Sequence, residues 1–448
     1  MDQDTVKEFK QIFSGNVILP RDDQYETARI TYVSKDSHPA IIVQPKTIKD
    51  IQTALSFGQN NSLRISVRSG KHSVAGFSTN DGGLVLDLAN FNSIEVLDKE
   101  AGLVRLGTGA TWGDVAVELA KYNLAISSGD TKSVGVGGLT LGGGIGWMLR
   151  KYGFTIDSLV GAEVVLADGS VVKASKSENP DLFWAIRGGG GNFGVVTYFD
   201  FKAHPVENIV VATTIYGVSN LQKIITGWRD HMRSAPRELT SFLTLMTDFG
   251  GPTPNVMLMS CYSNSDLKAA NKVIEPLRNL GEIISDETKV VDYPEILQEA
   301  HPPEGVRFSV KDMFVKNFDD DLIAQLSTIC CKEGSPIVQL RIMSGAIDDV
   351  NPDATAMAHR NNEVFLFAGF PIPLEATKEE EAHIMENWDL IASHSSGKYS
   401  NFLSSNTKND VSDIYPESTY KRLASIKLKY DPKNILNHNF NIKPALLR

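Results

Sequence analysis

A histidine lies in a loop that could bind phosphate. The loop 67–76, Val-Arg-Ser-Gly-Lys-His-Ser-Val-Ala-Gly, directly follows a predicted strand. Successive backbone N–H groups in such a turn can cradle phosphate oxygens. The loop lacks the Gly-Lys-Ser/Thr ending of a Walker A motif, and His72 is either a hydrogen-bonded turn residue or a nucleophile. The side chains that could add charge or a hydroxyl group to this cradle are Arg68, Ser69, Lys71 and Ser73.

A glycine-rich stretch dominates the middle of the first half of the chain. Seven glycines fall within the twelve residues 135–146. Such density indicates backbone that passes very close to another group or adopts positive φ. The glycines alternate with Val, Leu, Ile and Trp rather than with Ser and charged residues, so the stretch is expected to be buried and not a linker. We expect it to contact a large planar cofactor with a diphosphate.

Two further segments carry unusual patterns. The cluster 188–194 matches Gly-x-Gly-x-x-Gly, but it follows a predicted helix and precedes a predicted strand, the reverse of a dinucleotide-binding turn. We therefore interpret that match as accidental. The segment 430–444 interleaves asparagines with apolar residues, which predicts that it packs back into a site built elsewhere.

Composition narrows the classes of function. The chain has 448 residues and a formal charge of −10, which argues against a nucleic-acid or anionic-membrane partner. It shows no metal-ligand constellation and no hydrolytic Ser-His-Asp or Cys-His set, and its cysteines, Cys261, Cys330 and Cys331, lack the spacing of a disulfide framework or zinc site. We find no signal peptide and no apolar run of about 18 residues, so a cytoplasmic location is expected.

Two patterns of secondary structure follow each other along the chain. The first part alternates strands and helices: strands 39–45, 64–68, 84–88, 104–106, 163–167 and 195–200, an extended segment from 30 to 33, and helices 6–13, 46–57, 112–121 and 181–187. After Pro205 the glycine clusters stop and longer amphipathic segments begin: helices 220–233, 266–279, 320–331 and 378–393, with strands 256–262, 337–342 and 364–370. Such a second part fits a sheet covered on one face, a separate domain.

Taken together, four separated motifs resemble one family. They are Arg-Ser-Gly-Lys-His at 68–72, the glycine stretch at 133–146, Arg-Gly-Gly-Gly-Gly-Asn-Phe-Gly at 187–194, and Tyr-Asp-Pro at 430–432 leading to Asn-Ile-Lys-Pro at 441–444. In this order they are similar to FAD-linked oxidases of the vanillyl-alcohol oxidase type, with a PCMH-type FAD domain, and among them to the berberine-bridge-enzyme-like group. The resemblance is strong up to about Pro205 and again from about Leu403.

The resemblance implies an α+β fold. A two-lobed PCMH-type FAD-binding domain is expected from 1 to 207, completed by the C-terminal berberine-bridge-like segment 403–448. An inserted α+β substrate-binding domain, 208–402, is expected to carry a large antiparallel sheet with helices on one face.

The resemblance also implies a covalent cofactor. In this family the histidine at the place of His72 is bonded to the methyl carbon on the benzenoid edge of FAD. Lys71 stands where the family more often has glycine, and Thr131 stands where many members have a second, cysteinyl link. Because a hydroxyl is far too weak a nucleophile to replace a thiolate, we expect one bond, as in the branch with bacterial 6-hydroxynicotine oxidase.

By resemblance, the remaining site residues can be assigned. Val134 lies near the oxygen-reactive carbon of the flavin in this family, or else belongs to the core. Tyr399, in the element Tyr-Ser-Asn-Phe, orients the substrate, assists proton removal, or only packs, and Asn401 is its neighbour in the motif. The residues expected to bind FAD are Arg68, Ser69, Gly70, Lys71, His72, Ser73, Ser133, Val134, Gly135, Gly137, Gly138, Gly142, Gly144, Ile145, Val195, Val196, Asn439 and Asn441.

The implied function is an FAD-dependent oxidase. A hydride would pass from a small alcohol, amine or sugar-like substrate to the flavin, and O2 would reoxidise the flavin to give H2O2. Three alternatives stay open: a dehydrogenase of the same fold that excludes O2, a flavoprotein with structural FAD that acts as a cyclase or binding protein, and a secreted binding protein with vestigial oxidase parts. Fold alone does not choose the substrate.

Overall fold

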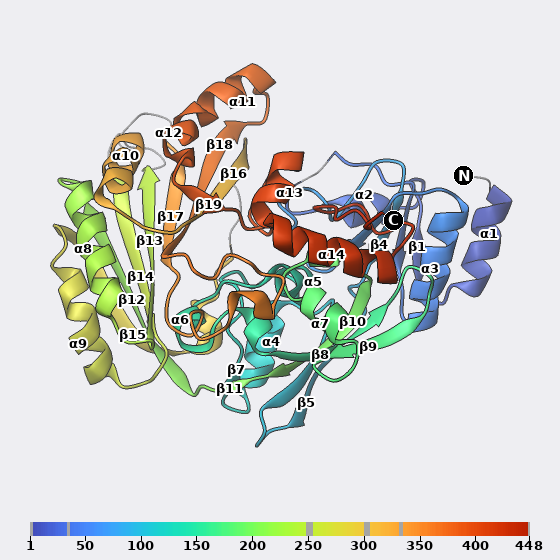
Figure 1. Ribbon diagram of the computed structural model, residues 1–448, viewed down its shortest axis with the longest axis horizontal. Coiled ribbons are helices and arrows are strands. Elements are labelled where there is room, and N and C mark those ends of the chain that lie inside the picture. Colours follow the sequence, from blue (N-terminus) through green and yellow to red (C-terminus); the bar gives the residue numbers. More distant parts are fainter. Residues whose placement is uncertain (1–2, 34–35, 248–253, 300–304, 331–334, 447–448) are drawn as a thin grey trace.

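The computed structural model describes residues 3–33, 36–247, 254–299, 305–330 and 335–446. Two smaller sheets and their helices lie on one side of the molecule, and a large sheet with its own helices lies on the other (Figure 1). Helices from the C-terminal part of the chain lie between them, and both labelled termini are on the side of the smaller sheets (Figure 1). The α+β class expected from the sequence is confirmed.

The first sheet supports the histidine loop. Its strand order is β1 (Asn16–Ile18), β2 (Ile41–Gln44), β4 (Leu84–Asp87) and β3 (Ile65–Arg68), with β2, β4 and β3 parallel. Apolar residues of β2 and β4 are fully buried, as expected for parallel strands covered on both faces. The connecting helix α3 (Ile48–Asn60) starts at a capping box made by Thr47 and Asp50, and β3 ends where the loop 67–76 begins.

The N-terminal helix covers this sheet. Helix α1 (Gln3–Ile12) packs its Phe9 ring on Phe57 of α3, with ring centroids 4.2 Å apart. The short helix α2 (Tyr25–Arg29) follows β1. The segment 30–33, which was expected to be extended, joins no sheet within the described residues and instead brings Tyr32 beside His72.

The second sheet is antiparallel and has the glycine stretch on one side. Its order is β5 (Ile94–Asp98), β6 (Leu103–Gly107), β10 (Val195–Lys202), β8 (Leu159–Val165) and β9 (Val171–Ser175). Helices α4 (Trp112–Ala120), α5 (Val136–Gly142) and α7 (Pro180–Ala185) contribute buried residues to the same core. Strands β5 and β9 were not predicted, because all their side chains except the buried Ala174 are half-buried or exposed and give no apolar run.

The third sheet has eight antiparallel strands. The order is β15 (Ile283–Asp292), β12 (Asn208–Gly217), β14 (Pro254–Tyr262), β13 (Leu239–Thr247), β17 (Ile337–Ile342), β18 (Val364–Pro373), β16 (Val306–Val315) and β19 (Ser395–Gly397). Its outer face is covered by α8 (Leu221–Ser234), α9 (Leu267–Arg278), α10 (Asp320–Cys330) and α12 (Asp389–Ala392) (Figure 1). Its inner face packs against residues of the glycine stretch.

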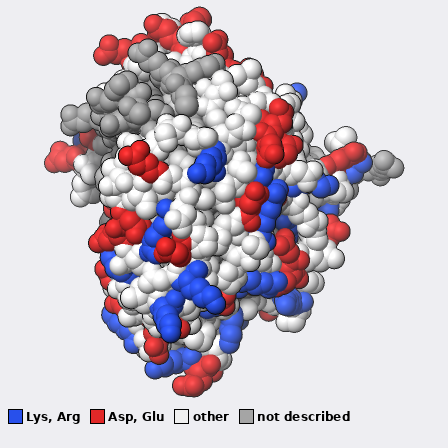
Figure 2. All heavy atoms as spheres, turned by 90° about the vertical axis from the view of Figure 1, so that its left-hand side faces the viewer, with Lys and Arg blue, Asp and Glu red and all other residues white. Residues whose placement is uncertain are grey.

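One predicted helix is interrupted. The pattern over 378–393 predicted a continuous helix, whereas the structure has α11 (Lys378–Met385), a 3₁₀ turn (Glu386–Trp388) and α12. Trp388 and Ile391 are buried in the main core, whereas Ile384, Met385 and Ala392 pack against it only partly buried. Helix α11 itself has no buried residue, so little burial holds the segment to one regular helix. The face of the molecule on the side of the large sheet, at the left of Figure 1, carries both acidic and basic side chains (Figure 2).

The C-terminal part returns to the smaller sheets. Helices α13 (Lys408–Ile414) and α14 (Glu417–Tyr430) precede an irregular stretch, 431–446, which we call the C-terminal segment. The buried Lys427 ammonium donates to Asp431 Oδ2 at 2.7 Å, to Leu436 O at 2.9 Å and to Asn192 O at 2.5 Å. All three of its protons are therefore used. The domain limits 1–207, 208–402 and 403–448 stay a prediction.

Replacing Lys427 by methionine should destabilise the protein strongly. The Asp431 carboxylate would be left buried without its counter-charge, which costs about 3–5 kcal/mol of the free energy of unfolding. Denaturant unfolding measures this loss. The matched control is Lys429→Met, because the exposed Lys429 pairs with Asp181 at the surface and such pairs contribute about 1 kcal/mol or less. Equal losses in the two variants would contradict the role assigned to the buried pair.

Candidate active site

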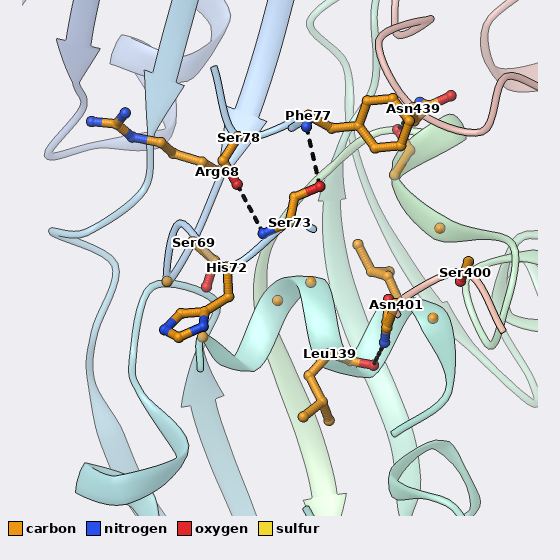
Figure 3. Close-up of a pocket in the computed structure, with 18 of the residues that line it drawn as sticks. Arg68, Ser69, His72, Ser73, Phe77, Ser78, Leu139, Ser400, Asn401 and Asn439 are labelled. Atoms are coloured by element: carbon orange, nitrogen blue, oxygen red, sulfur yellow. Dashed lines mark hydrogen bonds between the residues drawn. The ribbon is translucent and has the colours of Figure 1, made fainter. Parts of the chain in front are cut away.

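The two glycine-rich regions and the histidine loop line one cavity. Its volume is about 340 Å³, within the usual range for ligand sites. Residues from 65–78, 129–145, 190–196, 399–402 and 436–440 line it, so every motif singled out in the sequence contributes. Figure 3 shows the histidine loop on one side of the cavity and Asn401 with Asn439 on the other.

The glycines of this region serve two purposes. A Cβ on Gly70 would lie 2.2 Å from the nitrogen of Gly135, and a Cβ on Gly135 would lie 2.0 Å from Ser69 Oγ, so the two backbones are in direct contact. At Gly138 and Gly191 an added Cβ would meet nothing within 4 Å, although both residues line the cavity. Gly70 and Gly135 therefore allow two backbone segments to pack directly on each other. Gly138 and Gly191 leave their backbone uncovered by a side chain where it faces the cavity.

The polar side chains of the histidine loop are mostly used by the protein itself. The guanidinium of Arg68 donates to Asp87 at 2.8 Å, and both side chains are fully buried. Figure 3 shows this guanidinium directed away from Asn401 and Asn439. Ser69 Oγ donates to Thr108 O at 2.6 Å, and Ser73 Oγ accepts from the N–H of Phe77 at 3.1 Å. The charge of Arg68 and the proton of Ser69 are thus used inside the protein, whereas Ser73 Oγ only accepts and keeps its own proton for another partner. The phosphate-binding role expected of these groups stays a prediction.

Lys71 has a strained backbone. Its φ is 65°, in the left-handed region, where a Cβ is disfavoured. Burial, followed by the charge of Arg68, lowers the pKa of Lys71, and Asp87, 3.8 Å from its ammonium, acts in the opposite direction. Lys71 therefore adopts the backbone conformation that glycine adopts more easily, and this costs conformational free energy.

His72 is held between an aromatic ring and a hydroxyl group. Its ring stacks on Tyr32 with centroids 4.6 Å apart and planes 23° apart. Its Nε2 lies 3.0 Å from Ser133 Oγ, which in turn donates to Glu299 Oε2 at 2.8 Å. Burial raises the pKa of Tyr32, and the charges of Asp130 and Glu299 add to this effect. The imidazole is therefore positioned in a defined orientation at the cavity wall.

The tyrosine on the other side of the cavity receives two hydrogen bonds. Tyr399 is buried, and its hydroxyl oxygen accepts from the N–H of Gly144 at 2.8 Å and from Asn401 Nδ2 at 3.0 Å. Burial raises the pKa of Tyr399 to about 12, although both hydrogen bonds act in the lowering direction. Asn401 also donates to Leu139 O, a bond drawn in Figure 3. The phenol therefore keeps its proton at neutral pH.

A buried arginine joins the large sheet to the glycine stretch. Arg341 of β17 makes an ion pair with Asp130, which lines the cavity, and its Nε donates to Gln339 at 2.7 Å. Its guanidinium lies over the rings of Phe242 and Phe402, 4.3 and 5.4 Å from their centroids. The sequence analysis missed this residue. The signal was present, since two polar residues at alternate positions of an otherwise apolar strand face the same side.

Most of the expected site residues line the cavity. They are Arg68, Ser69, Gly70, Lys71, His72, Ser73, Val134, Gly135, Gly137, Gly138, Gly142, Ile145, Val195, Val196, Tyr399, Asn401 and Asn439, and Thr131 lines it as well. Three expected residues lie behind the wall: Ser133, Gly144 and Asn441. Val134 lines the cavity and also packs against the core of the second sheet. A position near the flavin and a role in core packing are therefore compatible for this residue. Across the described ranges, no three His, Cys, Asp or Glu side chains are grouped to hold a metal ion, and no helix is long and apolar enough to cross a membrane.

Comparisons with known proteins agree with these motifs. Residues 39–175 match the FAD binding domain family, and 398–443 match the berberine and berberine-like family. The chain is 30% identical to an (R)-6-hydroxynicotine oxidase of Paenarthrobacter nicotinovorans, over 96% of this chain and 97% of that one. It is 28% identical to a glucooligosaccharide oxidase of Sarocladium strictum, over 91% of this chain and 88% of that one. A crystal structure of 6-hydroxy-D-nicotine oxidase from Arthrobacter nicotinovorans superposes with a TM-score of 0.87 at 29% identity, covering 97% of this chain and 98% of that one.

Replacing Lys71 by glycine should stabilise the protein. Relief of the left-handed strain is expected to raise the free energy of unfolding by about 1 kcal/mol, and little is lost with an ammonium whose surroundings disfavour its charge. Thermal unfolding measures the change. Lys421→Gly, in the exposed middle of α14, is the control and should lower stability by about 1 kcal/mol. If Lys71→Gly also lowers stability, the strain is not what governs this position.

Proposed function

The chain belongs to the berberine-bridge-enzyme-like group of FAD-linked oxidoreductases, and on that premise we propose that it is an oxidase with one covalent link to FAD. A hydride would pass from a carbon next to a hydroxyl or amine group to the flavin, and O2 would reoxidise the flavin to give H2O2. The observation that carries the proposal is the meeting of His72, the glycine stretch and Tyr399 around a single cavity.

The residues around the cavity fit FAD. Bare backbone at Gly138 and Gly191 leaves room for a group that approaches closely. The carboxamide oxygen of Asn439, which lines the cavity, is buried and has no hydrogen-bond partner among the described residues, so it could accept from the cofactor. The oxygen of Asn441 is likewise without a partner among the described residues, but Asn441 lies behind the cavity wall. When bound, FAD supplies the acceptor of two electrons. The expected cofactor-binding residues that line the cavity are retained in the proposal, with backbone groups in place of the Arg68 side chain. Ser133, which does not line the cavity, is proposed to act through His72 and not by contact with FAD.

A single covalent bond is the finer part of the proposal. His72 stands at the cavity wall, and Thr131, at the position of the second link, also lines the cavity but offers only a hydroxyl. Its Oγ1 donates to Asp130 at 3.2 Å. With no thiol at this position, we propose a link through His72 alone.

Tyr399 is proposed to orient the substrate as a hydrogen-bond donor. Its oxygen already accepts two hydrogen bonds, from Gly144 and Asn401, so its own proton is available for a third partner. Because the pKa of Tyr399 is raised to about 12, the phenol does not serve as a base at neutral pH. A substrate oxygen or nitrogen at this point of the cavity would accept this proton, which holds the reacting carbon near the flavin. The small side chain of Val134 would leave access for O2.

The substrate is proposed to be a small alcohol, amine or sugar-like molecule. The two relatives described above are named as oxidases of 6-hydroxynicotine and of a glucooligosaccharide, so proteins similar to this chain act on an amine-containing molecule and on a sugar. The region 208–402 is proposed to be the substrate-binding domain, since Arg341 of its sheet pairs with the cavity residue Asp130, and Phe402, after the last strand, lines the cavity.

The proposal is tested by the location of the flavin after acid precipitation. Wild-type precipitate should stay yellow, and a single peptide containing His72 should carry the flavin mass. His72→Ala should release all its flavin into the supernatant, because no other nucleophile of this kind is proposed. If the acid precipitate of His72→Ala holds as much flavin as that of the wild type, the proposed covalent link through His72 is wrong.

Peroxide release distinguishes the oxidase from its alternatives. Screening small alcohols, amines and sugars should find a substrate that bleaches the flavin without oxygen and yields H2O2 in air. A dehydrogenase of the same fold would bleach but reoxidise slowly on timed exposure to air. A flavoprotein with structural FAD would convert its ligand without bleaching or oxygen uptake.

Replacing Tyr399 by phenylalanine should lower kcat about 10- to 100-fold, because an orienting hydrogen bond is lost. The content of covalent flavin should be unchanged, and the wild-type pH profile should show no break from Tyr399 at neutral or mildly alkaline pH. Steady-state kinetics with the substrate found above measure this. Tyr216→Phe is the control, since Tyr216 is equally buried but bonds Leu277 O under the outer helices. An unchanged kcat in Tyr399→Phe would remove the orienting role.

A further inference from the structure

A chain of three polar groups runs from the histidine to a carboxylate of the inserted region. Ser133 Oγ lies 3.0 Å from Nε2 of His72 and donates to Oε2 of Glu299 at 2.8 Å. Ser133 is 61 residues from His72 and 166 from Glu299 in the sequence. The groups come from the histidine loop, the glycine stretch and the turn that follows β15 and its 3₁₀ helix, Tyr293–Ile296.

Backbone hydrogen bonds place Glu299 beside Ser133. The N–H of Lys132 donates to Gln298 O at 2.9 Å, and the N–H of Gln298 donates to Asp130 O at 2.8 Å. These bonds form a parallel bridge between Thr131 and Gln298. Residues on either side of the bridge, Ser133 and Glu299, are therefore held in register, although Glu299 itself is exposed.

Proton counting fixes the direction of the chain. A serine hydroxyl has one proton, and an ionised carboxylate only accepts, so Ser133 gives its proton to Glu299 and must accept from His72. In a neutral imidazole that donates to Ser133, the hydrogen is on Nε2 and the lone pair is on Nδ1. The stacked ring of Tyr32 holds the plane of the imidazole.

We propose that Ser133 and Glu299 are positioning residues for the formation of the bond between His72 and FAD, and this rests on the proposed function. They fix the nucleophilic tautomer of His72 and take up the proton that it loses. Neither group needs to touch the cofactor, and Ser133 does not line the cavity.

The proposed step balances with O2 as oxidant. A C–H bond of the methyl group on the benzenoid edge and the Nε2–H bond break, and a bond forms between Nδ1 and the methyl carbon. The imidazole proton leaves through Ser133 to Glu299. The methyl proton leaves to water, and the two electrons that are released reduce the ring. O2 then takes these two electrons and two protons, as many as the methyl group and the imidazole have lost, to form H2O2.

The test is the rate of covalent attachment in apoprotein. Protein produced in riboflavin-starved cells is mixed with FAD in air, and acid-stable flavin is measured over time. Ser133→Ala should slow attachment on the order of 100-fold, as for loss of a proton-transfer group, while non-covalent FAD binding by fluorescence titration stays as in the wild type. Ser133→Thr keeps a hydroxyl and should restore most of the rate.

Glu299→Gln should slow attachment about tenfold, because a neutral amide takes up the proton poorly. The matched control is Glu287→Gln, an exposed glutamate of β15 far from the histidine loop, which should attach FAD as the wild type does.

Two results overturn the inference. One is attachment by Ser133→Ala at the wild-type rate, and the other is failure of Ser133→Thr to recover the rate lost in Ser133→Ala. The failure of the proposed function is distinguishable, because then wild-type protein would hold no acid-stable flavin at all. Binding measurements show whether each variant is folded and takes up FAD.

Discussion

The close contact between the backbones of Gly70 and Gly135 is the constraint on which the rest of the site depends. No side chain fits at either position, since an added Cβ would lie 2.2 Å or less from a backbone nitrogen or a serine oxygen. Contact at this distance places His72, two residues after Gly70, against Ser133, two residues before Gly135. Any larger residue would separate the two loops, and the histidine would lose both its hydroxyl partner and its place at the cavity.

A second constraint acts from the C-terminus. Lys427 bonds the carbonyl of Asn192, the carbonyl of Leu436 and the carboxylate of Asp431, so one ammonium joins α14, the C-terminal segment and the second glycine cluster. Burial of a charge is tolerable here because every proton has an acceptor. Asn439 of the C-terminal segment reaches the cavity for this reason, as does His438, whose Nε2 lies 2.8 Å from Thr79 O.

The sequence predicted the fold class and most of the cavity wall, but not the polar connections across it. Glycine density and the motif at 68–72 are local signals, and the structure brings both to the cavity. Strand β15 was missed because an exposed edge strand needs no apolar alternation. The side chain of Arg68 was assigned to phosphate because its charge was visible, whereas its partner Asp87 is 19 residues away and becomes its neighbour only when β3 pairs with β4. Glu299 and Arg341 likewise meet the glycine stretch only through tertiary packing.

The two sides of the cavity are built by opposite uses of hydrogen bonding. At His72 the Glu299 carboxylate accepts from Ser133, which leaves the serine oxygen to accept from Nε2 of a neutral imidazole and the lone pair on Nδ1. At Tyr399 the neighbours, a backbone N–H and an amide, both donate, which leaves the phenol as the donor toward the cavity. A residue's role in this site therefore follows from the count of donors and acceptors around it more than from its own chemistry. The same tyrosine surrounded by acceptors would have its proton occupied and could not orient a substrate.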